Sequence, residues 1–293
     1  MEEFLQQVVS GLASGGIFAS LALALVLIYR STGVVNFAQG EMAMFTTFVA
    51  WSLMEQLPYW PAFALTLVAA FLGGAVIELT LIRPVQSASP LTVVIITIGL
   101  LIGLNGLARR IWGNEPRTLE SPFSTDPVRI GGVAFSLQDL GIIAVSFVIV
   151  ALLWAFFRFT KLGLGLRASA TNPAESRLVG IRVPWMLALG WGLAAVLGAV
   201  AGMMAAPPLG SFDQNLMQPI LLYAFAAAVL GGIDSPIGAV VGGLLVGVMI
   251  NLIGTYVDFV GADLRLPVAL AIILAVLLVR PAGLFGREAV RRV

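Results

Sequence analysis

The sequence predicts an all-α, polytopic membrane protein, and three observations support this prediction. Hydrophobic residues make up 59% of the 293 residues, and the mean hydropathy is +1.02. Charged residues make up only 11%, whereas a soluble domain carries roughly 25%. Several apolar runs approach or exceed the ~20 residues that cross a bilayer. We therefore expect one transmembrane domain over residues 1–293, with roughly 8–10 membrane helices, some of them discontinuous, and no separate soluble domain.

Nine apolar runs divide the chain. They fall at residues 6–29, 40–56, 61–82, 91–108, 137–157, 184–206, 217–232, 237–256 and 266–279. The first run follows two glutamates and has no basic region before it, so we expect a membrane helix there and not a cleaved signal peptide. Runs 40–56 and 217–232 are short and are interrupted by small or polar residues. In transporters, such segments often mark discontinuous helices near the substrate path.

Arginine and lysine residues in the short loops predict the orientation. The basic segment 158–182 holds five basic residues against one acid, and the tail 280–293 holds four against one. Because excess basic charge favours the cytoplasmic side, both should be cytoplasmic, with segment 109–138 outside and Arg83 inside. The N-terminus is outside if run 40–56 crosses completely, and inside if that run is re-entrant.

The residue types that the chain lacks limit its chemistry. It has no cysteine and no histidine, which excludes thiolate and imidazole chemistry and the usual zinc and haem ligands. No G-x-x-x-x-G-K-[ST] motif occurs, so the chain has no P-loop for ATP. No serine can be paired with a histidine base. We therefore expect a non-enzymatic chain with no catalytic residue, metal or cofactor of its own, and nothing indicates nucleic-acid binding.

The basic segment 158–182 contains a short helix signal. Asn172 is a candidate N-cap, Pro173 fits the first helical position, and Glu175 lies three residues after the cap. Gly180 is expected to end the helix. A short, ordered helix that faces the cytosol favours a docking surface for a partner protein. An ordinary positive loop is the alternative.

Two polar bends that carry glycine lie between apolar runs, at residues 33–41 and 231–238. Backbone that leaves a helix at membrane depth must be buried in protein or face a water-filled cavity. The functional interpretation is that both bends line a translocation pathway, and the alternative is that they are tight interfacial turns. The candidate pathway residues are Gly33, Asn36, Gln39, Gly40, Glu41, Gly231, Gly232 and Asp234.

Other small and acidic residues have more ordinary interpretations. Glycines spaced four apart allow helices to approach closely, which predicts packing contacts at Gly198 and Gly202, Gly238 and Gly242, and Gly243 and Gly247. Glu41 and Glu78 are the acids nearest the apolar runs, and a buried carboxylate could serve as a proton relay. Each lies close to a loop or a run end, which favours a place at the membrane interface.

Four motifs resemble those of branched-chain amino-acid ABC importer permeases of the smaller, H-type subunit. They are YRSTGVVNFAQGE at 29–41, the pattern TKLG…RA…NP…GI within 160–181, GGIDSPIG at 231–238, and RPAGLFG at 280–286. The resemblance covers nearly the whole chain, with the motifs in the family's order. One departure is Gln39, where many relatives carry histidine.

The resemblance implies a permease subunit of an ATP-driven importer for branched-chain or other hydrophobic amino acids, working by alternating access. It implies four kinds of partner: a second permease subunit, two cytoplasmic ATPase subunits that bind the ATP, an extracytoplasmic substrate-binding protein, and the lipid of a bacterial or archaeal cytoplasmic (inner) membrane. It also assigns ATPase coupling to Asn172, Pro173, Glu175, Arg177 and Gly180.

Three alternatives stay open. Urea and short-chain amide permeases share these motifs, so the substrate is less defined than the family. From other classes, an ion-coupled carrier or channel would transport without ATP, and a membrane scaffold would not transport at all.

Overall fold

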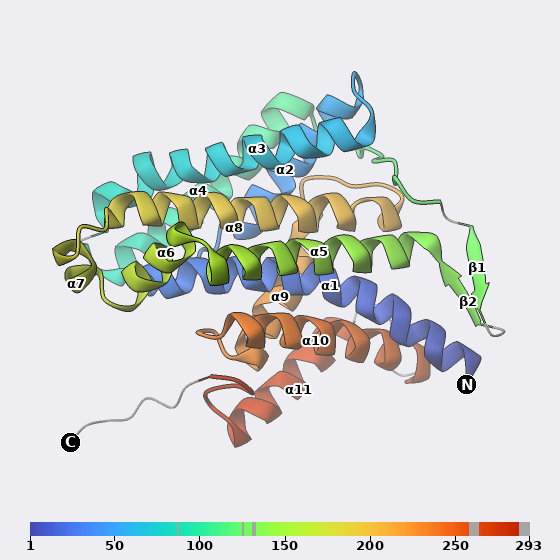
Figure 1. The fold of residues 1–293 in the computed structure, drawn as a ribbon. Coiled ribbons are helices and arrows are strands. Elements are labelled where there is room, and N and C mark those ends of the chain that lie inside the picture. Colours follow the sequence, from blue (N-terminus) through green and yellow to red (C-terminus); the bar gives the residue numbers. More distant parts are fainter. Residues whose placement is uncertain (87, 125, 131–132, 258–263, 287–293) are drawn as a thin grey trace.

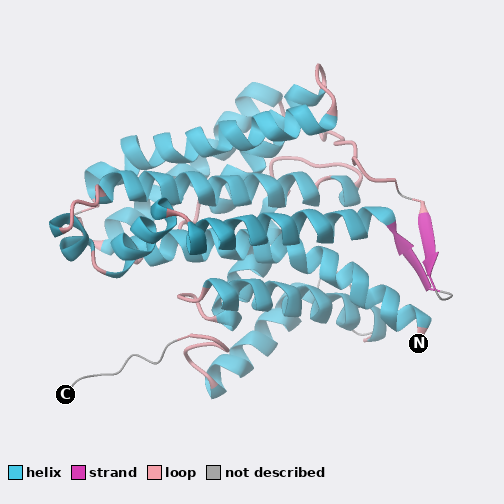
Figure 2. Ribbon diagram, in the orientation of Figure 1, coloured by secondary structure: helices cyan, strands magenta, loops and turns pink. Residues whose placement is uncertain are grey.

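A computed structural model describes the whole chain except residues 87, 125, 131–132, 258–263 and 287–293. Helices dominate the described chain, as Figure 2 shows, which confirms the all-α prediction. The α-helices are α1 (Glu2–Thr32), α2 (Gln39–Met54), α3 (Tyr59–Ile77), α4 (Pro90–Trp112), α5 (Leu137–Phe159), α6 (Lys161–Thr171), α7 (Pro173–Leu178), α8 (Val183–Ala205), α9 (Met217–Gly231), α10 (Pro236–Tyr256) and α11 (Arg265–Val279). Shorter helical turns are η1 (Glu78–Ile82), η2 (Arg83–Val85) and η3 (Pro207–Leu209).

Each of the nine apolar runs corresponds to one α-helix, and among the α-helices of the described residues α6 and α7 alone lie outside the runs. Within the described chain, six helical segments are long and apolar enough to cross a membrane. They are Glu2–Thr32, Tyr59–Val85, Pro90–Trp112, Leu137–Phe159, Val183–Leu209 and Pro236–Tyr256. Helices α2 and α9 have 16 and 15 residues, which confirms that these two runs are short. The chain is a multi-pass membrane protein.

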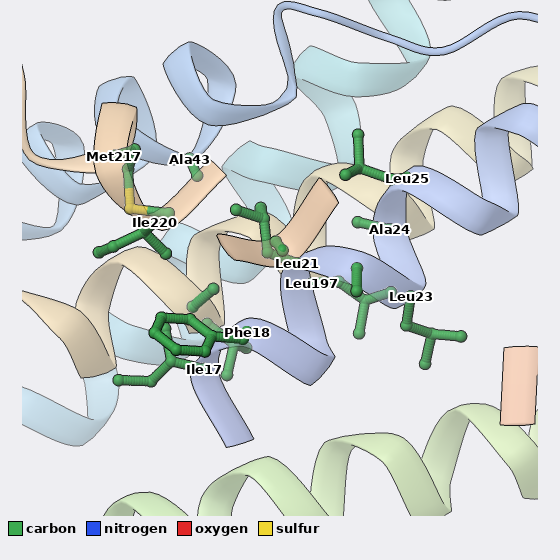
Figure 3. Close-up of a cluster of buried hydrophobic side chains, with 14 of the residues drawn as sticks. Ile17, Phe18, Leu21, Leu23, Ala24, Leu25, Ala43, Leu197, Met217 and Ile220 are labelled. Atoms are coloured by element: carbon green, nitrogen blue, oxygen red, sulfur yellow. The ribbon is translucent and has the colours of Figure 1, made fainter. Parts of the chain in front are cut away.

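Helix α1 lies at the centre of the bundle and packs against α5, α8, α9 and α10 (Figure 1). Residues 15–28 are all buried. Figure 3 shows side chains of α1 gathered with Ala43 of α2, Leu197 of α8, and Met217 and Ile220 of α9. A helix that is hydrophobic on all sides must be covered on all sides, by lipid or by protein. Here the cover is protein.

Glycine allows α1 and α10 to touch through their backbones. A Cβ atom at Gly11 would lie 2.6 Å from the Cα of Val248, and one at Gly15 would lie 2.8 Å from the Cα of Leu244. On α10, Gly243 and Gly247 meet the backbone of α1 in the same way. The other predicted pairs also pack closely, since Gly198 and Gly202 face α2 and Gly238 and Gly242 face α9. The packing interpretation of all three pairs is confirmed.

Two neighbouring glycines in α3 provide a test of such packing. A Cβ atom at Gly74 would lie 2.6 Å from the carbonyl oxygen of Trp191 in α8, whereas one at Gly73 meets nothing within 4 Å. We expect Gly74→Ala to destabilise the protein by about 1–3 kcal/mol, because the two helices must move apart. Gly73→Ala should be neutral or slightly stabilising, because alanine favours the helix. Thermal unfolding in detergent measures both, and equal melting temperatures would contradict this packing.

The two ends of the bundle carry different segments. In Figure 1, α6 and α7 lie at one end, and the N-terminus and the two strands lie at the other. Ser10 Oγ donates a hydrogen bond to Asp139 Oδ2 (2.7 Å), so the start of α1 lies beside the start of α5. Arg83 Nη2 donates to the carbonyl oxygen of Pro184 (2.9 Å), so Arg83 lies at the end that carries segment 158–182. These contacts favour the alternative in which the N-terminus shares a side with 109–138.

Two local elements differ from the sequence expectation. Segment 109–138 contains an antiparallel hairpin of β1 (Pro127–Ile130) and β2 (Val133–Ser136), for which the all-α expectation made no provision. The Gly-Gly pair between alternating residues in the sequence is a hairpin signal. Segment 158–182 contains α6 in addition to the predicted helix, because Thr160 Oγ1 caps α6 by accepting a hydrogen bond from Gly163 N (2.9 Å). The basic residues at 287, 291 and 292 lie outside the described residues.

The absence of cysteine makes the orientation testable with single cysteines. We expect Thr118→Cys, in the outer segment, to react with a membrane-impermeant maleimide when the membrane is intact. Thr171→Cys, at the end of α6, should react only after lysis. Both side chains are exposed in the fold, so burial cannot explain a difference between them. The reverse labelling pattern would show that the charge-based orientation is wrong.

Candidate functional site

Helix α7 has the local geometry that the sequence predicts. Asn172 Oδ1 accepts a hydrogen bond from Glu175 N (3.2 Å), and Pro173 is the first helical residue. Gly180 has a φ of +85°, a left-handed conformation that glycine adopts without strain and that suits a helix end. Helix α7 contacts α6 and α8, and α6 in turn contacts α1, α5 and α8. A displacement of α7 can therefore reach the centre of the bundle through α6.

The end of α7 exposes two apolar side chains that sequence reasoning missed. Leu178 is 87% exposed and Val179 is 77% exposed. Glu175 and Arg177, on the same helix, are exposed as well. Burying such an apolar side chain is worth about 1.5–3 kcal/mol, and an exposed apolar patch with a polar rim is typical of a protein–protein contact. The available signal was a pair of consecutive apolar residues directly after the polar residues 175–177.

The first bend, residues 33–41, turns from the surface into the protein. Gly33 ends α1 at the surface with a φ of +72°. Asn36 and Gln39 are both at most 1% exposed. Gln39 Nε2 donates to the carbonyl oxygen of Ala194 in α8 (2.9 Å), and a Cβ atom on Gly40 would lie 3.1 Å from Leu221 of α9. Residues 39–41 already belong to α2, and the non-helical residues 34–38 are largely buried in protein, apart from Phe37, which is 39% exposed.

The second bend, residues 231–238, is covered by the C-terminal motif at 280–286. Leu284 N donates to the carbonyl oxygen of Leu230 (2.8 Å), and Phe285 N donates to that of Gly231 (2.9 Å). Gly232 has a φ of +107°, and a Cβ atom there would lie 2.6 Å from Gly286 N. Asp234 is half-buried. Two of the four motifs therefore form one structural unit, in which the glycines permit the backbone contact.

A polar ladder of Glu41, Asn105 and Arg109 connects the interior to the surface of the bundle. Asn105 Nδ2 donates to Glu41 Oε2 and to the carbonyl oxygen of Gln214, both at 3.1 Å. Arg109 Nε donates to Asn105 Oδ1 (2.8 Å). Glu41 is buried, whereas Arg109 is exposed. Glu41 was a predicted pathway residue, but its partners were not predicted, although the i, i+4 spacing of Asn105 and Arg109 was a usable signal.

Both candidate relay acids are buried within the protein, and the contact of Arg83, the partner of Glu78, with Pro184 agrees with the expected place of Glu78 near the membrane interface. Glu78 is fully buried. Its carboxylate accepts hydrogen bonds from Arg83 Nη2 (3.0 Å) and Gln86 Nε2 (2.7 Å). Glu78 can reach both Arg83 and Gln86 because the π-helical turn η1 and the following turn η2 bring these three side chains together. Removing either partner would leave this buried carboxylate less well compensated, which is destabilising.

Comparison with known proteins decides the family. The family profile described as "Branched-chain amino acid transport system / permease component" matches residues 7–279. The chain belongs to this permease family. Family membership agrees with the four motifs and with the apolar, multi-pass fold.

Relatives within the permease family align over nearly their whole length. The chain is 30% identical to the high-affinity branched-chain amino acid transport system permease protein LivH of Salmonella typhimurium, over 99% of this chain and 98% of LivH. It is 31% identical to the permease protein BraD of Pseudomonas aeruginosa, with the same coverage of both chains. Among solved structures, a chain of PsaBC from Streptococcus pneumoniae in complex with Fab gives a TM-score of 0.50 at 17% identity, covering 95% of this chain and 92% of that one. This last likeness concerns the fold alone.

Proposed function

We propose that this chain is the permease subunit of an ATP-driven importer for branched-chain or other hydrophobic amino acids. The observation that carries the proposal is the exposed apolar end of α7 on a capped helix that is joined to the bundle core. A self-sufficient carrier or channel has no need of such a docking surface. In the importer, that surface meets a partner that hydrolyses ATP, and this chain contributes transport and not hydrolysis.

The proposed assembly has two permease subunits, two cytoplasmic ATPase subunits and an extracytoplasmic substrate-binding protein, in the cytoplasmic (inner) membrane of a bacterium or archaeon. ATP is bound by the ATPase subunits. Closure of the ATPase pair moves α7 as a rigid body, and α6 transmits the motion to α1, α5 and α8. Asn172, Pro173, Glu175, Arg177 and Gly180 belong to this coupling unit, to which the structure adds Leu178 and Val179.

The polar ladder supports an amino acid as the substrate. A free amino acid carries an ammonium and a carboxylate, and the ladder places a carboxylate, Glu41, and a guanidinium, Arg109, on either side of Asn105. Such charge-assisted hydrogen bonds are about twice as strong as neutral ones. Urea and short-chain amides carry neither charge, so the ladder favours an amino acid over them.

The two bends complete the proposed pathway. Gly33, Asn36, Gln39 and Gly40 lead into α2, which carries Glu41. Gly231, Gly232 and Asp234 lie at the end of α9, the helix that meets Gly40 through Leu221. A movement of α9 against α2 would therefore change the space beside the ladder.

Purification and uptake together test the function. The tagged full-length chain, expressed in its native host and extracted in mild detergent, should co-purify with an ATPase subunit in fixed stoichiometry. Reconstituted into vesicles with its binding protein, the complex should accumulate labelled leucine only when ATP is present, and should not accumulate urea. Leucine uptake without ATP would indicate a carrier, and the absence of any ATPase partner would contradict the importer.

A further inference from the structure

A lateral groove of about 640 Å³ lies between α1, α5, α6 and α10. In Figure 1, α5 and α6 lie on one side of this part of α1, and α10 lies on the other. The groove walls are apolar and include Leu27, Phe147, Trp154 and Ile237. Trp154 is 58% exposed and Ile237 is 66% exposed, so the groove opens sideways from the bundle. Since α5 and α10 are membrane-crossing helices, this opening faces the hydrocarbon of the bilayer.

Three arginines line one end of the groove. Arg30 is in the last turn of α1, Arg158 is in the last turn of α5, and Arg167 is in α6. Among the described lining residues none is acidic. The Nε of Arg167 is buried and has no hydrogen-bond partner within the described chain. The arginines lie at the end that carries α7, where the membrane meets the cytoplasm in the orientation given above.

The groove therefore combines an apolar wall at the depth of the acyl chains with positive charge at the depth of the headgroups. An anionic phospholipid has the same two parts in the same order. Basic pockets between transmembrane helices on the cytoplasmic side bind anionic headgroups, and each arginine near the surface is worth enough to change affinity severalfold. The volume lies within the range of small-molecule sites, about 300–1,000 Å³.

We propose that this groove is a binding site for one anionic phospholipid of the cytoplasmic leaflet, with its phosphate between Arg158 and Arg167 and one acyl chain along α5 and α10. A second copy of this chain fits less well, because a twofold contact here would bring the same arginines together. A single apolar helix from another protein would match the walls but would supply no negative charge for Arg158 and Arg167.

Native mass spectrometry tests the lipid site on the full-length chain with its accompanying subunits. Delipidated protein is titrated with phosphatidylglycerol or with phosphatidylcholine of the same acyl chains. We expect phosphatidylglycerol to be retained preferentially. In the double variant Arg158→Gln with Arg167→Gln, the ratio of retained phosphatidylglycerol to retained phosphatidylcholine should fall about fivefold for each arginine removed. Arg182→Gln, at the same end of the bundle and outside the groove, is the matched control and should keep the preference.

A second pair of variants tests the apolar wall. Ala151→Trp fills the groove and should reduce retention of phosphatidylglycerol, whereas Val148→Trp, which is exposed on the same helix outside the groove, should not. Glycerol phosphate alone should not displace the lipid. Equal retention of the two lipids, unchanged binding in Ala151→Trp, or displacement by glycerol phosphate would each overturn the proposal, as would a helix of another protein found cross-linked in the groove.

Discussion

Changing Leu178 and Val179 together to aspartate should abolish ATP-driven uptake and leave the bundle folded. Both side chains are exposed in this chain, so the substitutions remove no internal packing. If they are buried against an ATPase subunit, each apolar contact is worth about 1.5–3 kcal/mol, and affinity should fall by about a hundredfold or more. Co-purification of the ATPase from mild detergent measures the loss directly, and the thermal unfolding temperature measures the fold.

The matched control for this double variant is Leu209→Asp. Leu209 is a 60% exposed leucine in η3, and η3 lies at the outer end of the bundle, opposite α7. It should retain the ATPase. Within α7, the single change Glu175→Arg should give a milder result, with the complex assembled and substrate-stimulated ATP hydrolysis lost. If the aspartate double variant co-purifies with the ATPase as the wild type does, then the end of α7 is an ordinary exposed loop.

The positions of the nine apolar helices could be predicted from the sequence, but the identity of the central helix could not. The most apolar 18-residue stretches of α1 and α4 have almost the same mean hydropathy, 2.2 and 2.3. Yet 89% of this stretch of α1 is buried in the fold, against 17% of the stretch of α4. Lipid and protein interior are both apolar, so hydropathy does not distinguish them. Glycine spacing does not distinguish them either, because Gly99 and Gly103 of α4 have the same spacing as Gly11 and Gly15 of α1 and meet nothing within 4 Å.

The predicted parts of the candidate site depend on local contacts along the chain, and the missed parts depend on contacts between distant segments. The ends of α7 depend on Asn172 and Gly180, which act on backbone a few residues away, so a local pattern was sufficient. The polar ladder joins Asn105 to Glu41 and to Gln214, which are 64 and 109 residues away in the chain. Contacts at such separations depend on how the helices pack, and no local pattern specifies them.

Changing Glu41 to glutamine should reduce leucine uptake by about tenfold to a hundredfold. Glutamine has nearly the same shape and retains an oxygen that can accept the hydrogen bond from Asn105. The variant therefore removes the negative charge while the ladder remains in place. A hydrogen bond between the substrate ammonium and a carboxylate contributes about 1.5–3 kcal/mol, which corresponds to this loss. Uptake into vesicles, normalised to the amount of assembled complex, is the measurement.

The control for this variant is Glu55→Gln, because Glu55 directly follows the same helix, α2, and is exposed. It should transport leucine normally. A second comparison uses 4-methylpentanoate, which has the side chain and carboxylate of leucine and lacks the ammonium. The wild type should transport leucine in strong preference to 4-methylpentanoate. Glu41→Gln should lose much of that preference, because the ammonium of leucine then has no carboxylate with which to form a hydrogen bond. Unchanged discrimination in the assembled variant would show that Glu41 serves the packing of α2 against α4 and does not contact the substrate.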